Sequence, residues 1–401
     1  MKVAMISEHA SPLAALGGVD AGGQNVHVAA LSAALAERGH EITVYTRRDD
    51  PDAPEQVTTA DGYRVVHVPA GPARHLPKDE LLPHMGEFGA FLRDRWSAAR
   101  PDVAHAHFWM SGLAAELAAR DVEVPVVQTF HALGTVKRRH QGAADTSPPA
   151  RIRLERMIAT RASRVVATCS DEVFELTRMG VPRHRISVVP CGVDTGTFTP
   201  DGPAAARGPC PHRLLSVGRM VPRKGFEIAV RALAALPDTE LVVVGGTDAE
   251  RDEADRLRSI AAEVGVAQRV TMLGQVPRHA MPGLFRSADV VLCTPWYEPF
   301  GMVPLEAMAC ARPVVATAVG GMIDSVADGV TGRLVASLEP EAIAEAVRPL
   351  LLDDALRTAW GAAGAARART RYGWDRIANQ TAAVYRQAVP ALAGEIASAA
   401  R

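Results

Sequence analysis

Two glutamates eight residues apart, Glu298 and Glu306, mark the stretch of this chain with the clearest chemistry, residues 288–321. An apolar strand-like run ends before Glu298, and a helix-like run follows Gly301. A helix N-terminus carries partial positive charge and unsatisfied N–H groups, which suit a phosphate. Carboxylates accept hydrogen bonds from sugar hydroxyls. A site with both kinds of group fits a phosphate joined to sugars, as in a nucleotide sugar.

Two cations form a second candidate site. Arg219 and Lys224 stand five residues apart, in a Pro-containing loop between a strand that ends at Gly218 and a helix. Cations in this position suit a diphosphate, although a solvated basic loop has the same pattern. The chain is rich in arginine, and its lysines are Lys2, Lys78, Lys137 and Lys224. A lysine retained in such a chain is more often functional, because a mobile ammonium suits phosphate.

The first half of the chain carries glycines and a histidine at the ends of predicted strands. Glycines between residues 17 and 23 follow the first strand, where a doubly wound sheet lets a phosphate approach the backbone. His131 follows a strand near residues 125–130, at the carboxyl end where α/β sites collect. The basic run from Lys137 to His140 is either a solvated loop or an anion site for a phosphorylated acceptor.

Two patterns that resemble metal sites are not favoured as such. His105 and His107 share one side of a predicted strand. They lack a third ligand at a suitable spacing, so we favour histidines of a cleft over metal ligands. Asp50 and Asp52 match an Asp-X-Asp pattern but lie in a polar loop apart from the other signals. We therefore expect no metal site.

The predicted elements alternate between apolar strands and helices, which favours an α/β fold with parallel sheets. Residues 195–212 are rich in Pro, Gly and Ala without periodicity, so we interpret them as an interdomain linker. The predicted domains are an N-terminal Rossmann-like domain at 1–195 and a second at 205–372, followed by a C-terminal helix at 373–401.

The composition limits the function further. The 401 residues are 48% hydrophobic and 22% charged, and the formal net charge of −1 gives no sign of a nucleic-acid partner. No run approaches the ~20 apolar residues of a transmembrane helix. The five cysteines form no CxxC pair, which is typical of free thiols in a reducing compartment, so we expect a cytoplasmic protein. The oligomeric state is not predicted.

Five strings together resemble the family-4 retaining glycosyltransferases of the GT-B fold. They are the loop at 17–27, His107-Phe-Trp-Met-Ser, the run from Thr129 to Lys137, the run from Val217 to Lys224, and Glu298 to Glu306. The branch with the greatest resemblance contains sucrose-phosphate synthases and the mycothiol-pathway N-acetylglucosaminyltransferases. The resemblance implies two Rossmann-like doubly wound parallel-sheet domains that face a central cleft, with a C-terminal helix that crosses back to the first domain.

The resemblance also implies roles for the donor-site residues. Glu298 would hold the donor sugar, Glu306 the ribose hydroxyls, and Arg219 with Lys224 the pyrophosphate. The full expected donor site is Gly23, Arg219, Lys224, Glu298, Phe300, Gly301, Met302, Val303 and Glu306, with the base near Gln275 to Arg278. His131 would lie beside the transferred sugar. The expected catalytic residues are His131, Glu298, Arg219 and Lys224, with no essential metal and no cofactor besides the nucleotide-sugar co-substrate.

The acceptor residues match the family less well. The candidates are Asn25, Lys78, Phe108, Lys137, Arg138 and Arg151. In a relative that uses an inositol phosphate, a Lys, a Tyr, a Thr and an Arg hold the acceptor phosphate, and Lys78 and Arg151 match two of them. Phe108 stands where the Tyr is expected and Ala132 where the Thr is expected. Two hydroxyl donors are therefore missing, which favours a different phosphorylated or polyol acceptor.

The sequence therefore predicts a retaining hexosyltransferase. The favoured donors are UDP-glucose and UDP-N-acetylglucosamine, ahead of GDP-mannose, and the acceptor is a small polar sugar or polyol, with or without a phosphate. No carboxylate nucleophile is evident beside His131, and the resemblance implies attack from the face of the leaving phosphate. A sugar-nucleotide 2-epimerase and a non-catalytic nucleotide-sugar-binding module remain alternatives. A dehydrogenase is disfavoured because the GxGxxG fingerprint is absent.

Overall fold

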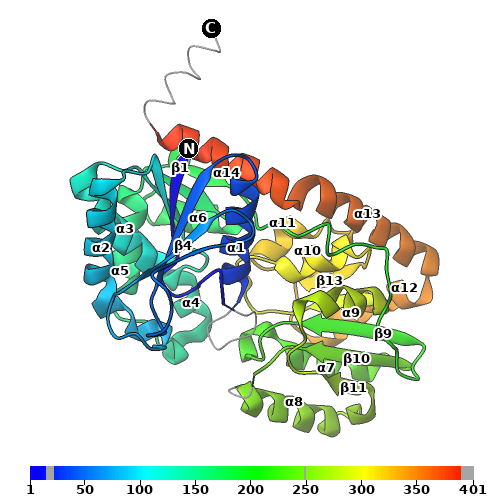
Figure 1. Ribbon diagram of the computed structural model, residues 1–401. Helices are drawn as coiled ribbons and strands as arrows, with labels where there is room; N and C mark the ends of the chain where they lie inside the picture. Colours follow the sequence, from blue (N-terminus) through cyan, green and yellow to red (C-terminus); the bar gives the residue numbers. More distant parts are fainter. Residues whose placement is uncertain (15–21, 248–249, 390–401) are drawn as a thin grey trace. The chain divides into compact units, whose positions relative to one another are not determined.

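The computed structural model describes residues 1–14, 22–247 and 250–389, and the chain divides into two compact units (Figure 1). Of the described residues, unit 1 contains 1–14, 22–190 and 374–389. Unit 2 contains 191–247 and 250–373. Each unit has its own parallel sheet and its own helices, so each is described by itself.

Unit 1 is built on an eight-stranded sheet in the order β3-β4-β2-β1-β5-β6-β7-β8. All neighbouring pairs are parallel except β3 and β4 at one edge. The strands are β1 Lys2–Ile6, β2 Glu41–Arg47, β3 Gln56–Thr58, β4 Arg64–Val68, β5 Val103–His107, β6 Val126–Thr129, β7 Arg164–Ala167 and β8 Ile186–Val188. The order reverses direction between β1 and β5, where open α/β sheets bind their ligands.

Seven α-helices accompany this sheet in the described residues. They are α1 Gly23–Ala36, α2 Met85–Ala98, α3 Trp109–Val122, α4 Gly134–Gln141, α5 Arg151–Arg161, α6 Ser170–Arg178 and α14 Trp374–Ala388. The last of these comes from the end of the chain. Ile377, Thr381 and Tyr385 recur every four residues and are all buried, so α14 presents one face to the core beside α1. The predicted C-terminal helix that returns to the first domain is thus confirmed.

Unit 2 has a six-stranded, fully parallel sheet in the order β11-β10-β9-β12-β13-β14. Its strands are β9 His212–Val217, β10 Thr239–Val244, β11 Val270–Met272, β12 Val290–Cys293, β13 Val314–Thr317 and β14 Gly332–Val335. Its α-helices are α7 Phe226–Ala232, α8 Arg251–Glu263, α9 Met281–Ser287, α10 Met302–Ala309, α11 Gly321–Ser325, α12 Pro340–Leu352 and α13 Asp354–Tyr372. The order reverses between β9 and β12, so the loops after these two strands are the expected ligand site.

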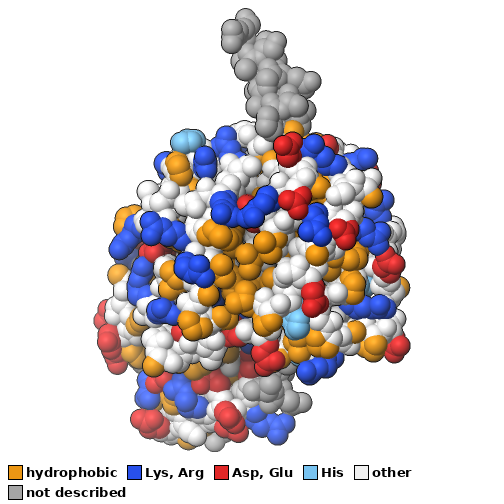
Figure 2. Space-filling model, turned by 90° about the vertical axis from the view of Figure 1, so that its left-hand side faces the viewer, with side chains coloured by type: hydrophobic (Ala, Val, Ile, Leu, Met, Phe, Trp, Pro, Cys, Tyr) orange, Lys and Arg blue, Asp and Glu red, His pale blue; other side chains and the backbone are white. Residues whose placement is uncertain are grey.

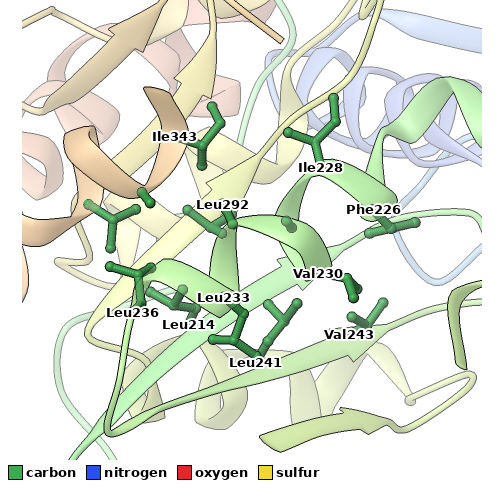
Figure 3. Packing of buried hydrophobic residues seen from close by; sticks show 14 of the residues in the cluster. Leu214, Phe226, Ile228, Val230, Leu233, Leu236, Leu241, Val243, Leu292 and Ile343 are labelled. Carbon is green, nitrogen blue, oxygen red and sulfur yellow. The ribbon is translucent and has the colours of Figure 1, made fainter. Parts of the chain in front are cut away.

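The core of unit 2 explains why these runs form strands. Figure 3 shows Leu214, Leu241 and Leu292 from neighbouring strands packed against Phe226 and Val230 of α7. The strands carry apolar side chains in succession, which is typical of a parallel sheet covered on both faces. This packing holds the ends of β9 and β12 at one edge of the sheet.

The segment predicted to be a linker packs onto unit 2 instead. Phe198 is 1% exposed and its ring lies 5.8 Å from that of Phe285. Arg207 pairs with Asp289 at 2.6 Å. A run without periodicity can still be ordered by a few anchoring side chains, which a composition argument does not detect. The units accordingly divide between residues 190 and 191, before the predicted start of the linker.

Figure 2 shows the face formed by the layer of helices on the left of Figure 1, where α2, α3 and α5 lie. Apolar side chains gather in the middle of this face, and Lys and Arg side chains lie around them. Leu117 of α3 is 42% exposed. None of the helices among the described residues combines the length and the apolar character needed to cross a membrane.

Candidate active site

Glu298 is the centre of the candidate site in unit 2. It lies in the loop between β12 and α10, is 7% exposed, and its Oε2 accepts a hydrogen bond from Nζ of Lys224. Nη1 of Arg223 is 4.0 Å from the same oxygen. Burial alone would raise the pKa of Glu298, but the charges of Lys224 and Arg223 outweigh burial and hold that pKa below its usual value. The carboxylate is therefore an ionised acceptor.

Glu306 is the second buried carboxylate of unit 2. It lies in α10, is 7% exposed, and accepts a hydrogen bond from Nη1 of Arg278 at 3.0 Å. Burial raises the pKa of Glu306 above its usual value even though Arg278 opposes this shift. Arg278 also lies 5.0 Å from the ring centre of Phe198, in the segment once predicted to be a linker.

Glycines shape the backbone around Glu298. Gly301 has φ +69° and directly precedes α10, and Gly320 has φ +48°. The N–H of Gly321 donates to the carbonyl oxygen of Glu298 at 2.8 Å. A Cβ on Gly320 would overlap that same carbonyl oxygen. The glycine pair after β13 thus sets the position of the Glu298 loop, while Phe300, Met302 and Val303 lie half-buried at the start of α10.

Arg219 and Lys224 each pair with a different carboxylate. Nε of Arg219 donates to Glu250 at 3.0 Å, and the same carboxylate accepts the backbone N–H of Met220. Lys224 pairs with Glu298. The two cations follow the same strand, and the loop between them contains a short 3₁₀ segment at Pro222–Lys224. Their joint role on a diphosphate stays a prediction.

Buried histidines occupy the corresponding edge of unit 1. His131 follows β6 with φ +61°, a conformation that costs energy outside glycine. Its Nε2 is 2.9 Å from Nδ1 of His107, the last residue of β5. His27 of α1 packs edge-on to His131 at 5.2 Å. Burial, helped by the neighbouring histidines, lowers the pKa of both His107 and His131 well below 6.5, so these rings are neutral at neutral pH.

Acid will destabilise unit 1 through this histidine cluster. Burial lowers the pKa of His27 to about 4. Between pH 6.5 and 4 this ring is therefore protonated in the unfolded chain but neutral in the folded chain. Stability is therefore full above pH 6.5 and falls as the pH drops toward 4, by about 3 kcal/mol for this residue. Urea unfolding at several pH values measures the slope. The variant His27→Phe is expected to flatten it, whereas His184→Gln, at an exposed position, will not. Equal slopes for all three proteins would contradict this prediction.

Two of the predicted acceptor residues, Lys78 and Arg151, lie near the ring of Phe108. Phe108 precedes α3 with φ +81° and is 5% exposed. Nζ of Lys78 lies 5.6 Å from its ring centre, and the guanidinium of Arg151 lies 5.1 Å from it. Arg151 is buried, pairs with Glu155 at 2.7 Å, and donates to the carbonyl oxygen of Ala132 at 2.8 Å. Two cations therefore meet at one apolar ring.

Other predicted acceptor residues have local roles. The side chain of Asn25 caps α1, because its Oδ1 accepts from the N–H of Gly22 and its Nδ2 donates to Ser11, both at 2.9 Å. Lys137 pairs with Asp145 at 3.0 Å. Arg138 is exposed.

Parts of the predicted glycine loop and the rejected metal patterns can also be located. Gly17 and Gly18 lie outside the described residues, and Gly23 is the first residue of α1. Asp50 and Asp52 are exposed. No group of three or more His, Cys, Asp or Glu residues suited to a metal ion occurs in the part of the chain that the structure describes.

Sequence reasoning missed several partners of the site residues. Arg223 stands directly beside Lys224, and this second adjacent cation was the available signal. Arg278 was expected near a base, but its pairing with Glu306 was not. Glu250, the partner of Arg219, directly precedes α8 and carries no sequence signal. Its role depends entirely on which strands are neighbours.

Comparison with known proteins covers nearly the whole chain. The family model "Glycosyltransferase Family 4" matches residues 21–197, and "Glycosyl transferases group 1" matches residues 209–367. The D-inositol 3-phosphate glycosyltransferase of Xylanimonas cellulosilytica is 40% identical over 96% of this chain and 97% of its own length. That of Kineococcus radiotolerans is 39% identical over 98% of this chain and 97% of its own length.

Solved structures agree in fold. Sucrose-phosphate synthase from Thermosynechococcus elongatus superposes with a TM-score of 0.88 at 31% identity, over 96% of this chain and 98% of that protein. Anabaena Alr3699/HepE, solved in complex with UDP-glucose, superposes with a TM-score of 0.71 at 21% identity, over 96% of this chain and 98% of that protein. At 21% identity, the similarity to Alr3699/HepE concerns the fold alone.

Proposed function

The chain belongs to the family-4 glycosyltransferases of the GT-B fold, and from this premise we propose that it transfers a hexosyl unit from a UDP-sugar to a small phosphorylated polyol or sugar. The enzyme class follows from the family. The identity of the donor, the acceptor and the stereochemical course are the proposal. UDP-glucose and UDP-N-acetylglucosamine are the favoured donors, and retention of configuration is the expected outcome.

The buried Glu298–Lys224 pair beside the start of α10 is the observation that carries the donor assignment. The ionised carboxylate accepts hydrogen bonds from sugar hydroxyls, and the ammonium offers positive charge to a phosphate. The N–H groups at the start of α10 add further donors. A nucleotide sugar carries all the groups that this set complements.

The cations around Phe108 support a phosphorylated acceptor. Lys78 and Arg151 bring two positive charges to one apolar ring in unit 1. The relatives with 39–40% identity are named for an inositol phosphate, and the 31% identical structure for a sucrose phosphate. These names share a phosphate on a small hydroxylated molecule. Phe108 and Ala132 supply no side-chain hydroxyl, so the acceptor phosphate would depend on the two cations.

The proposed mechanism assigns each residue a task in transfer. Lys224 and Arg219 would oppose the charge that develops on the leaving diphosphate, as preorganised electrostatic stabilisation. Glu298 would orient the hexose, and the acceptor hydroxyl would attack from the face that the phosphate leaves. The departing phosphate would take the acceptor proton. His131 would hold the sugar and would not serve as a base, because its pKa lies well below 6.5 and its ring is buried.

A substrate panel tests this function. The protein is incubated with UDP- and GDP-sugars, with and without inositol phosphates and hexose phosphates, and nucleotide release is followed. Release that requires one donor and one phosphorylated acceptor supports the proposal and identifies both. Turnover with an unphosphorylated polyol alone would overturn the acceptor assignment. Isomerisation of a donor without an acceptor would overturn transfer.

Replacing Lys78 by methionine is expected to lower kcat/KM for the phosphorylated acceptor by about 10- to 100-fold, the worth of one charge-assisted hydrogen bond. Slow hydrolysis of the donor in the absence of acceptor should not change. The matched control is Lys137→Met, because Lys137 is already paired with Asp145. Initial rates at varied acceptor concentration measure both variants. A larger loss in the control would place the acceptor phosphate at the basic run instead.

A further inference from the structure

Glu250 is a largely buried carboxylate of unit 2 to which the proposed reaction assigns no task. It directly precedes α8, and its side chain is 11% exposed. Its Oε1 accepts a hydrogen bond from Nε of Arg219 at 3.0 Å, and its Oε2 accepts one from the backbone N–H of Met220, also at 3.0 Å. One carboxylate therefore holds the side chain of a predicted diphosphate-binding residue and the backbone that follows it.

The end of β10 packs closely against the loop after β9, which carries Arg219. Gly245 has φ +123°, and a Cβ there would overlap the carbonyl oxygen of Gly218. Gly246 has φ +99°, and a Cβ there would lie 3.1 Å from Cβ of Met220. Backbones approach this closely where glycine leaves room for them. These contacts do not involve the carboxylate at the start of α8, so the loop should stay in place when that carboxylate is removed.

The hydrogen bond at Nε determines which edge of the guanidinium remains for a ligand. A guanidinium presents its donors in a fixed fork, with one edge formed by Nε and an Nη atom and another by the two Nη atoms. Glu250 takes Nε of Arg219, and within the described residues neither Nη atom donates a hydrogen bond. The side chain of Arg219 is 44% exposed. Its Nη edge can therefore make a bidentate contact with phosphate oxygens.

We propose that Glu250 is a positioning residue that orients Arg219 so that both of its Nη atoms face the diphosphate of the donor. This inference rests on the proposed function, because it takes Arg219 as a ligand of the diphosphate. The carboxylate is fixed at two points, so it restricts rotation of the guanidinium before the donor arrives. A side chain that is already ordered loses less entropy on binding than a freely rotating one.

A carboxylate beside a phosphate-binding cation could instead compete with the donor. The phosphate would then have to displace Glu250 from Arg219. The hydrogen bond from Met220 opposes this, because it holds the carboxylate on the backbone whether or not the guanidinium is paired. The two roles predict opposite effects. Removing a positioning carboxylate weakens nucleotide binding, whereas removing a competing carboxylate strengthens it.

Calorimetric titration of the full chain with UDP and with uridine tests the proposal. Glu250→Leu is expected to weaken UDP binding about tenfold, within the range of coupling between residues in contact. Uridine binding should not change, because uridine has no phosphate. The matched control is Glu253→Leu, which removes a carboxylate of α8 that pairs with Arg256 and should bind both ligands like the unmodified protein. Melting temperatures of both variants report folding.

A double-mutant cycle shows whether Glu250 acts through Arg219. In an Arg219→Met background, adding Glu250→Leu should change UDP affinity by less than about twofold. Unchanged or tighter UDP binding in Glu250→Leu, equal losses of UDP and uridine, or an equal loss in both backgrounds would each overturn the proposal. If the unmodified protein binds GDP in place of UDP, the same comparison is made with GDP and guanosine. Binding of neither nucleotide would overturn the proposed function and this inference with it, so the two failures are distinguishable.

Discussion

Replacing Lys224 by methionine is expected to lower kcat/KM for the donor by on the order of 10³-fold, because it removes the one ammonium that lies against Glu298 and would face the diphosphate. Methionine keeps the length and the apolar stem of the side chain, so the loss reports charge. The pKa of Glu298 will rise as well, since Lys224 is the strongest of the charges that hold it down. Steady-state rates at varied donor concentration measure the effect.

The same substitution separates charge pairing from catalysis. Removing Lys224 leaves the buried carboxylate of Glu298 with Arg223, 4.0 Å away, as a weaker partner, so the loss of stability should stay below the about 3–5 kcal/mol of a fully unpaired buried charge. The double variant Lys224→Met with Glu298→Gln should recover most of that stability and none of the activity. Lys2→Met, at an exposed strand position, is the matched control and should change neither the stability nor the activity. Full activity in Lys224→Met would remove this lysine from the donor site.

Gly320→Ala is expected to destabilise unit 2 by about 3 kcal/mol or more and to abolish most transfer. The position has φ +48° and ψ −131°, a region that glycine alone adopts readily. The new methyl group would also overlap the carbonyl oxygen of Glu298, which accepts the N–H of Gly321. Relief of this overlap must move the Glu298 loop. Urea unfolding and donor kinetics measure the two effects.

Gly329→Ala provides a control for backbone strain. Gly329 has φ +71°, yet a Cβ there would meet no atom within 4 Å. Alanine at this position costs about 1–2 kcal/mol through its left-handed backbone alone and should leave KM for the donor unchanged. If the two variants behaved alike, the contact between Gly320 and the Glu298 loop would have no special role.

The order of strands and helices was predictable because apolar runs alternate with helical periodicity throughout both units. The strand β12 and the helix α10 appear where the run before Glu298 and the run after Gly301 predicted them. The segment at 191–211 was not predictable in this way. Its order comes from single anchors such as Phe198 and Arg207, whose partners are about 80 or more residues away in the sequence.

The predicted donor residues near Glu298 lie close together in the sequence. Glu298, Gly301 and Glu306 belong to one strand–loop–helix unit, so their spacing predicted that they lie near one another, while their donor roles stay a prediction. The pairing of Arg219 with Glu250 depends on the neighbouring strand β10 and could not be derived from spacing. The local hydrogen bonds of Asn25 could not be derived from spacing either, since its side chain contacts the start of its own helix and the carbonyl oxygen of Ser11; its acceptor role stays a prediction.

Unit 1 is formed by two parts of the chain that are far apart in the sequence, and this affects how it folds during synthesis. Residues 1–190 leave the ribosome first, but Ile377, Tyr385 and the rest of α14 complete their core. Until those residues emerge, the apolar face of α1 lacks the side chains of α14 that pack against it, and His105 lacks the hydroxyl of Tyr385. The described residues of unit 2 all lie between 191 and 373, so they can pack before translation ends. The core of unit 1 therefore stays incompletely packed until α14 has been synthesised.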